Sequence, residues 1–315
     1  MRSSTSTRAG ALLVLALSAA ACTIGDDGSV PPAPSSAAGA SSAAGAAGAA
    51  GPGAAAPSSS AAGPPSGSSR PAPPSDDPLQ VALEQAVTAV GGRASVAVAG
   101  GGRVVSAGNA TGFPAWSTIK VPLVMAAMER TASPEPVVTA DMRAAITRSD
   151  NAAAEAIWSS LGPPAKAGAA VREVLRAGGD RATEVQVAKV RPEYSAFGQT
   201  VWDAGPAATF AARLPCSPSG RATLALMTGV DANQQWGLFG PVGAQPVGVK
   251  GGWGPGTDGA YVVRQLAVVR TARGSTGVML SARPADGSFA SGRAALTRLG
   301  EAIRAHLGAL PAGRC

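Results

Sequence analysis

A serine and a lysine lie three positions apart in the segment Trp116-Ser117-Thr118-Ile119-Lys120. If a helix begins here, Ser117 and Lys120 lie on one face of it, one turn apart. A lysine that loses its proton on desolvation can accept the proton of the serine hydroxyl, so this pair could form an acyl-serine without a histidine. The alternative is a helix-capping serine beside a surface lysine, and the spacing alone does not separate the two.

Lysine is rare in this chain, which makes each lysine informative. Only four of the 26 basic residues are lysines, at positions 120, 166, 189 and 250. Arginine stays protonated in proteins, whereas burial readily deprotonates lysine. A lysine kept in an arginine-rich chain therefore favours a chemical role.

A second candidate motif, Ser149-Asp150-Asn151, lies between two stretches that we expect to be helical, 141–148 and 152–161. On a tight turn, the Ser149 hydroxyl could relay a proton and the Asn151 amide could hold a substrate amide. The alternative is that these residues cap the following helix, a position that suits all three.

A third motif, Lys250-Gly251-Gly252-Trp253, ends a strand that we expect at 247–249. Glycines allow a ligand to approach the backbone closely, and the lysine adds a positive charge. A glycine-rich hairpin turn with an incidental lysine is the alternative. Each motif is weak alone, but the three in this order are a stronger signal.

The composition excludes several classes of function. The chain has 315 residues and a single histidine, His306, and its three cysteines are far apart. We therefore expect no metal centre and no cofactor. Residues 78–315 carry 23 basic and 15 acidic groups, a net charge of +8, but the arginines are dispersed and aromatic residues are few. Nucleic acid is thus not an expected partner.

The N-terminus predicts export. Residues 1–21 have arginines near the start and an apolar run at 9–21, which is too short to span a bilayer and typical of a signal peptide. The small residues Ala19-Ala20-Ala21 before Cys22 resemble a bacterial lipobox, although Ala19 stands where leucine is preferred. We expect Cys22 to be acylated, which would anchor the protein to the outer face of the cytoplasmic membrane. Ordinary cleavage nearby is the alternative.

The next segment, 22–77, has the composition of a tether. Ala, Gly, Pro and Ser make up 47 of the 55 residues at 23–77, and none is aromatic. Such a segment cannot bury enough apolar surface to offset its ordering entropy, so we expect a disordered linker. The folded domain is then residues 78–315.

The periodicity of that domain predicts an α+β fold: a five-stranded antiparallel sheet with terminal helices and an inserted helical lobe. Helices are expected at 78–90 and 289–307, mostly helical structure at 117–228, and strands at 95–99, 103–107, 247–249, 261–269 and 276–282. Cys216 and Cys315 favour a disulfide in an exported protein, with two free thiols as the alternative. We expect a monomer.

These motifs resemble those of the penicillin-recognising serine enzymes, and among them the class A β-lactamases, which share Ser-x-x-Lys, Ser-Asp-Asn and Lys-Thr-Gly. The resemblance covers nearly all of residues 78–315. It implies the β-lactamase/transpeptidase fold, with a reduced helical lobe because only 32 positions separate Ser117 from Ser149. The stretches Arg191-Pro192-Glu193-Tyr194 and Gly-Gln-Thr-x-Trp at 198–202 are also similar to uncharacterised exported β-lactamase-like lipoproteins of actinobacteria.

By this resemblance, Ser117 is the acylated nucleophile and Lys120 its activator, while Ser149 passes a proton to the leaving nitrogen. Asn151 would bind the acyl-amide side chain. Lys250 would position Ser149 and attract a substrate carboxylate.

The resemblance also implies an oxyanion hole made by the backbone N–H groups of Ser117 and Trp253, with Gly252 beside them. Glu193 would be the deacylating base. Two departures are clear: Gly251 replaces the hydroxyl residue of the third motif, and Phe197 stands where the family has an asparagine that positions water.

Two functions remain open. One is an active hydrolase that forms an acyl-serine with a β-lactam or a related cell-wall amide or ester. The other is an envelope-binding lipoprotein that keeps the cleft but turns over little. The retained lysines favour the first, and Gly251 and Phe197 favour the second.

Overall fold

The computed structural model describes residues 77–131, 133 and 135–315. The expected signal peptide, the expected acylation site Cys22 and the linker as far as residue 76 lie outside the described residues. Asp77, which we placed at the end of the linker, belongs to the folded part. Its side chain accepts a hydrogen bond from the backbone of Leu79 at 3.1 Å and caps the first helix, which begins at Pro78.

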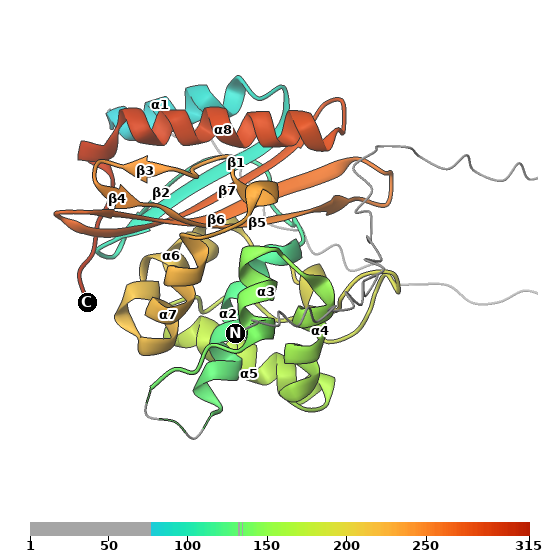
Figure 1. Ribbon diagram of the computed structural model, residues 1–315. Coiled ribbons are helices and arrows are strands. Elements are labelled where there is room, and N and C mark those ends of the chain that lie inside the picture. Colours follow the sequence, from blue (N-terminus) through green and yellow to red (C-terminus); the bar gives the residue numbers. More distant parts are fainter. Residues whose placement is uncertain (1–76, 132, 134) are drawn as a thin grey trace, which may run out of the picture. The chain divides into compact units, whose positions relative to one another are not determined.

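Eight α-helices and a five-stranded sheet make up the described part (Figure 1). The helices are α1 Pro78–Thr88, α2 Lys120–Glu129, α3 Ala140–Thr147, α4 Asn151–Ser160, α5 Pro164–Ala177, α6 Ala204–Ala212, α7 Pro218–Met227 and α8 Phe289–Ala305. The strands of the main sheet are β1 Gly92–Gly100, β2 Arg103–Gly108, β5 Gly248–Pro255, β6 Tyr261–Thr271 and β7 Gly274–Pro284. Two-residue strands, β3 Pro241–Val242 and β4 Gln245–Pro246, form a separate ribbon that the sequence did not predict.

The main sheet is antiparallel in the order β2-β1-β7-β6-β5, which confirms the predicted fold class. Four of its strands are largely buried on both faces, while the edge strand β2 is buried only at Val105 and Ala107. Along β1, Ala97 and Ala99 pack with the helical layer, while Val96 and Val98 pack with α1 and α8. In Figure 1, α1 and α8 cover one face of the sheet and α2 to α7 lie on the other. The molecule thus has two cores, and a functional cleft can form where the helical layer meets the sheet.

One expected strand is longer than the sequence pattern indicated. The pattern ended it at residue 249, yet β5 pairs with β6 from Gly248 to Pro255. The strand therefore includes the whole Lys250–Trp253 motif. Glycine lowers strand propensity, so periodicity ends too early here, and only the pairing with β6 carries the strand through its glycines.

The helical layer also contains a long non-helical segment. Most of residues 117–228 are helical, but the chain between α5 and α6 has only one short turn of 3₁₀ helix, Phe197–Gln199. The expected Cys216–Cys315 disulfide is present, with 5.2 Å between the two Cα atoms. It joins the end of the chain to the helical layer. No helix in the described ranges is both long and apolar enough to cross a lipid bilayer.

Candidate active site

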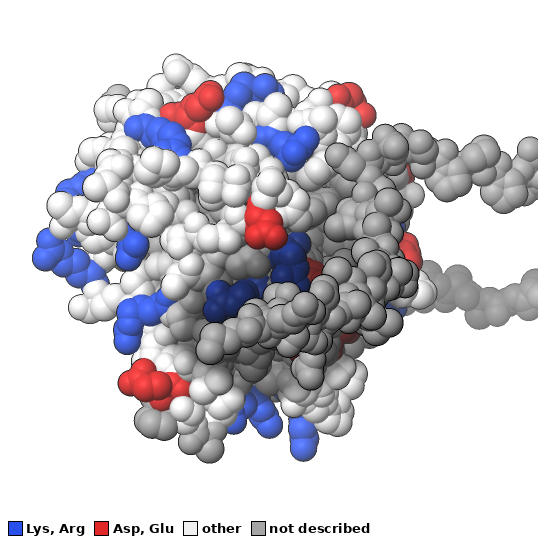
Figure 2. All heavy atoms as spheres, in the orientation of Figure 1, with Lys and Arg blue, Asp and Glu red and all other residues white. Residues whose placement is uncertain are grey.

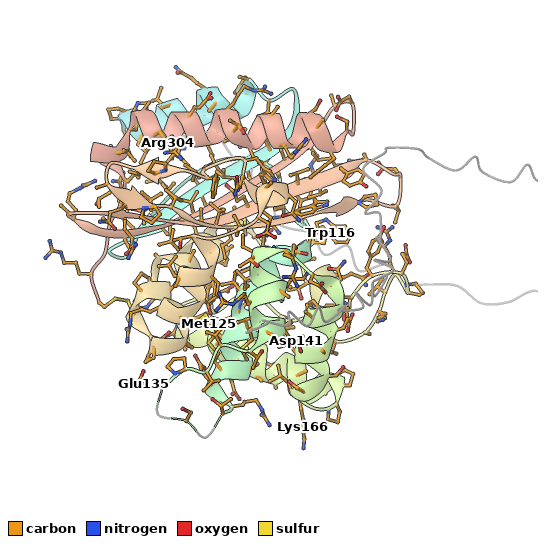
Figure 3. The ribbon with its side chains drawn as sticks, viewed as in Figure 1. Trp116, Met125, Glu135, Asp141, Lys166 and Arg304 are labelled. Carbon is orange, nitrogen blue, oxygen red and sulfur yellow. A yellow bond between two sulfur atoms is a disulfide. The ribbon has the colours of Figure 1, made fainter. Side chains whose placement is uncertain are left out.

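Ser117 and Lys120 belong to one continuous helical turn at the junction of the two layers. Trp116–Ile119 form a 3₁₀ turn that leads directly into α2 at Lys120. Figure 3 shows Trp116 where the helical layer meets the sheet, while Met125 of α2 lies deeper in the helical layer. Ser117 is half-buried, Lys120 is 1% exposed, and both line a cavity of about 310 Å³.

The Lys120 amine is held by the second motif. Its Nζ donates to the backbone oxygen of Ser149 at 2.6 Å, to that of Asp150 at 3.2 Å and to Asn151 Oδ1 at 2.7 Å. No hydrogen bond joins it to the Ser117 hydroxyl in the part of the chain described. Because three acceptors use all three N–H groups of an ammonium, the amine must lose a proton before a lone pair is free for Ser117.

Burial favours that loss. Desolvation lowers the pKa of Lys120 to about 7, against the opposing negative charges of Asp150 and Glu155. The neutral amine, which the sequence argument required for a general base, is therefore accessible near neutral pH.

Ser149 connects the two lysines. It lies between α3 and α4 with a φ of +60°, which turns the residue so that its backbone oxygen faces Lys120 and its hydroxyl accepts from Lys250 Nζ at 2.9 Å. Among the described residues, Ser149 and Trp116 (φ +49°) are the non-glycine residues with positive φ. Such strain is sustained only where the surroundings enforce it, and here it lies on both sides of the cavity.

Lys250 is fully buried in β5 and has three partners: Ser149 Oγ, Gln234 Oε1 at 2.5 Å and the backbone oxygen of Gly251 at 2.8 Å. Burial, and then the nearby charge of Lys120, lower the pKa of Lys250 well below its ordinary value. Lys250 therefore does position Ser149 in this structure, but it does not line the cavity.

Gln234 is a site residue that sequence reasoning missed. Its side chain is completely buried. Its Oε1 accepts hydrogen bonds from Lys250 Nζ and, at 3.0 Å, from the Gly251 backbone N–H. Its Nε2 donates to the backbone oxygens of Ile146 and Thr147 at 2.9 and 2.8 Å. It thus joins the third motif to the end of α3. Two adjacent glutamines in a loop carry no sequence signal for this role.

The free edge of β5 carries one of the two backbone N–H groups that the resemblance assigns to an oxyanion hole. Since the Gly251 N–H bonds to Gln234, it points away from β6, and residues two apart on a strand point the same way. The Trp253 N–H is therefore directed to the same unpaired edge. Gly252 lies so close to the nucleophile turn that a Cβ there would be 2.9 Å from the backbone nitrogens of Ser117 and Thr118. Trp253 and Ser117 thus approach one another across this glycine.

Glu193 lines the cavity but is held by Arg191. Its Oε1 accepts from Arg191 Nε at 3.1 Å and Nη2 at 3.0 Å, and its side chain is 54% exposed. Its pKa is lowered, chiefly by a backbone hydrogen bond and also by Arg191, so it is a carboxylate at neutral pH. Arg191 also donates to the backbone oxygen of Pro255 at 2.6 Å, which fixes the loop to the end of β5.

The rest of the cavity wall is largely aromatic. Four aromatic residues are among those that line it: Trp116, Tyr194, Phe197 and Trp253. Trp116 and Tyr194 meet edge to face at 5.0 Å, and the Trp116 Nε1 is the one buried side-chain polar atom without a partner among the described residues.

The described residues contain no group of three or more His, Cys, Asp or Glu placed to hold a metal ion. Charges on the surface are mixed: Figure 2 shows basic and acidic side chains interspersed, with basic atoms deep in the hollow at the centre of this face.

Solved structures share this architecture. A class A β-lactamase from Mycobacterium abscessus is 18% identical, with 73% of this chain and 99% of that one covered and a TM-score of 0.55. A β-lactamase from Xanthomonas campestris is 20% identical (74% and 98% covered, TM-score 0.55), and a class A enzyme from Bacteroides cellulosilyticus is 14% identical (73% and 98% covered, TM-score 0.58). The chain has the β-lactamase fold. No protein-family model and no curated protein sequence matches it.

The β-lactamase fold therefore brings together the residues chosen from sequence. Ser117, Lys120, Asn151, Glu193 and Trp253 line one cavity. Ser149, Lys250 and Gly252 lie directly behind its wall, in contact with residues of the cavity or its hydrogen-bond network.

We predict that acylation of Ser117 depends on pH through Lys120. Because the neutral amine is the base, the rate should fall about tenfold per pH unit below pH 7 and level off above it. Lys120→Arg should abolish the reaction, since arginine keeps the charge but not the base. Timed labelling with a fluorescent fluorophosphonate measures this, with the exposed Lys166→Arg as control. A flat profile between pH 5 and 9 would contradict the role of Lys120.

We also predict that Gln234→Leu destabilises the domain by about 2–3 kcal/mol, because a buried amine and a buried N–H lose their acceptor. Urea denaturation measures the free energy of unfolding. The neighbouring exposed Gln235, whose side chain makes one hydrogen bond, to the backbone oxygen of Val230, offers a matched Gln235→Leu control. Equal losses of unfolding free energy in the two variants would show that the hydrogen bonds of Gln234 stabilise the domain no more than those of an exposed glutamine.

Proposed function

We propose that this protein is an exported serine hydrolase that forms an acyl intermediate on Ser117 with a small β-lactam or a related cell-wall amide or ester. One observation carries the proposal: the buried Lys120 amine, with a pKa of about 7, faces the same cavity as Ser117 and is bonded to the segment of Ser149 and Asn151. The β-lactamase fold supports a serine hydrolase in general terms.

Acylation would begin when the neutral Lys120 amine accepts the Ser117 proton and the oxygen attacks the substrate carbonyl. The N–H groups of Ser117 and Trp253 would stabilise the oxyanion. Ser149 would then pass its hydroxyl proton to the leaving group, and Lys120 would restore that proton to the Ser149–Lys250 pair. The Asn151 oxygen is occupied by Lys120, so its amide N–H₂ is left to donate to an acyl-amide oxygen of the substrate.

Deacylation would need a water molecule activated by Glu193, which is ionised and lines the cavity. The pairing of Glu193 with Arg191 opposes this role, and the buried Phe197 offers no hydrogen bond to a water. We therefore expect acylation to be faster than deacylation. The same observation favours the second candidate function, an envelope protein that binds its ligand and turns over little.

The proposal includes export and a lipid anchor at Cys22. It is supported by the signal-like residues 1–21 and by the Cys216–Cys315 disulfide, since disulfides persist in oxidising compartments outside the cytoplasm. Small-molecule substrates of the envelope would then be accessible to a monomer held at the membrane surface.

We predict a covalent adduct on Ser117 with a fluorescent penicillin or a fluorophosphonate, seen by intact-mass spectrometry and absent in Ser117→Ala. A chromogenic cephalosporin should give a burst of about one equivalent before slow turnover. No adduct across a broad panel of probes would remove the hydrolase proposal. Steady hydrolysis without a burst would show that deacylation is not limiting.

We predict that an alkyne-bearing palmitate fed to bacteria expressing the full chain labels the protein, and that Cys22→Ser loses this label. Cys315→Ser is the matched control and should keep it. A wild-type chain recovered without the label would exclude the anchor.

A further inference from the structure

The Lys250 amine has no capacity left for a substrate. An ammonium has three N–H donors, and a neutral amine has two donors and one lone pair, so either form makes three hydrogen bonds. Ser149, Gln234 and the Gly251 backbone take all three positions. Lys250 is also completely buried. A substrate carboxylate could reach it only by displacing a buried protein partner.

The neighbouring position cannot supply a hydroxyl donor. A Cβ on Gly251 would lie 2.8 and 3.1 Å from indole carbons of Trp236 and 3.1 Å from one of Trp253. Both tryptophans pack in the core between the sheet and α8, and Trp253 also stacks near Phe289. The space in which a side chain at 251 would extend is thus filled by aromatic rings.

Arg264, which lies on β6 opposite this motif, already uses its guanidinium in hydrogen bonds within the protein. Arg264 pairs across the sheet with Gly252, but its guanidinium is 1% exposed. It donates to the backbone oxygens of Phe113 at 3.2 Å and Pro114 at 3.1 Å, to that of Trp202, and to Ser281 Oγ at 3.0 Å. Its charge holds the chain that leads to Ser117 and does not face the cavity.

The charged residues that line the cavity leave no excess of positive charge. The charged residues there are Lys120, Lys189, Glu155 and Glu193, two of each sign, and no arginine is among them. Lys120 is committed to three acceptors, so Lys189 is the one cation of the wall without a hydrogen bond or ion pair among the described residues. Lys189 is exposed and lies on the loop that carries Glu193. The uncharged residues of the wall are the four aromatic residues together with Ser117, Asn151, Ala152, Ser195 and Gly198.

From these contacts we infer that the site takes an acyl donor with no carboxylate next to the attacked carbonyl: an uncharged, apolar ester or amide whose ring or chain packs on Trp116 and Tyr194. The inference rests on the proposed acyl-serine chemistry and narrows its substrate class. The serine oxygen forms the acyl ester, and the neutral alcohol or amine of the donor leaves with a proton.

The test compares one donor with and without its carboxylate. Benzylpenicillin and its methyl ester are each incubated with the full chain, and the rate of Ser117 adduct formation is followed by intact-mass spectrometry. Each rate is divided by the rate of spontaneous hydrolysis in the same buffer, which removes differences in intrinsic reactivity. An uncharged ester, p-nitrophenyl phenylacetate, is the third probe.

We expect the methyl ester to acylate Ser117 at least one-third as fast as the acid, and p-nitrophenyl phenylacetate to react as well. A site that anchors the carboxylate by charge-assisted hydrogen bonds would lose about 10- to 100-fold when the charge is removed. Lys189→Gln should leave all three rates within about twofold.

If benzylpenicillin acylates Ser117 ten times faster than its methyl ester or more, the inference is wrong, while the hydrolase proposal stands. If Lys189→Gln abolishes that preference, Lys189 is the anion anchor, and the inference is equally wrong. No adduct from any of the three probes with folded protein would remove the proposed chemistry itself, and the substrate class with it.

Discussion

Two buried lysines share one serine at the centre of this protein. The backbone oxygen of Ser149 accepts from Lys120, and its hydroxyl accepts from Lys250. Burial disfavours positive charge and lowers the pKa of both lysines, and the charge of Lys120 lowers the pKa of Lys250 further. When Lys120 loses its proton it keeps two N–H donors and gains a lone pair, which the proposed chemistry uses to accept the Ser117 proton.

The remaining architecture keeps this arrangement in place. Gln234 joins β5 to the end of α3, and Arg264 joins β6 to the chain before Ser117. Gly252 and Gly254 let β5 approach the nucleophile turn, since a Cβ on Gly254 would lie 2.6 Å from the Trp116 indole. The backbone strain at Trp116 and Ser149 is sustained because packing on both sides leaves no alternative position. Rigid contacts of this kind define a site more sharply than loops do.

The sequence predicted the site where the signal is local. Ser117 and Lys120 lie one helical turn apart and Ser149-Asp150-Asn151 precede a helix, as spacing and capping preferences indicated. Their roles were assigned by the resemblance to the penicillin-recognising serine enzymes. The five strands were predicted as short β runs, two before and three after the helical segment, and the sheet followed from that order of elements. Gln234 and Arg264 could not be found because their roles arise from pairing between distant segments. Because glycine lowers strand propensity, the sequence pattern ended β5 too early. No local feature of the sequence indicated that Trp236 fills the space beside Gly251.

The cavity links substrate choice to the fate of the acyl intermediate. Trp116 and Tyr194 beside Ser117 offer apolar surface to an acyl group. Glu193 is ionised, but Arg191 and the end of β5 hold it, so using it as a base means giving up charge-assisted bonds. The acyl-serine should then persist. A hydrolase and a binding protein differ here in one rate constant, that of deacylation, because the same residues serve both up to the point at which the acyl bond has formed.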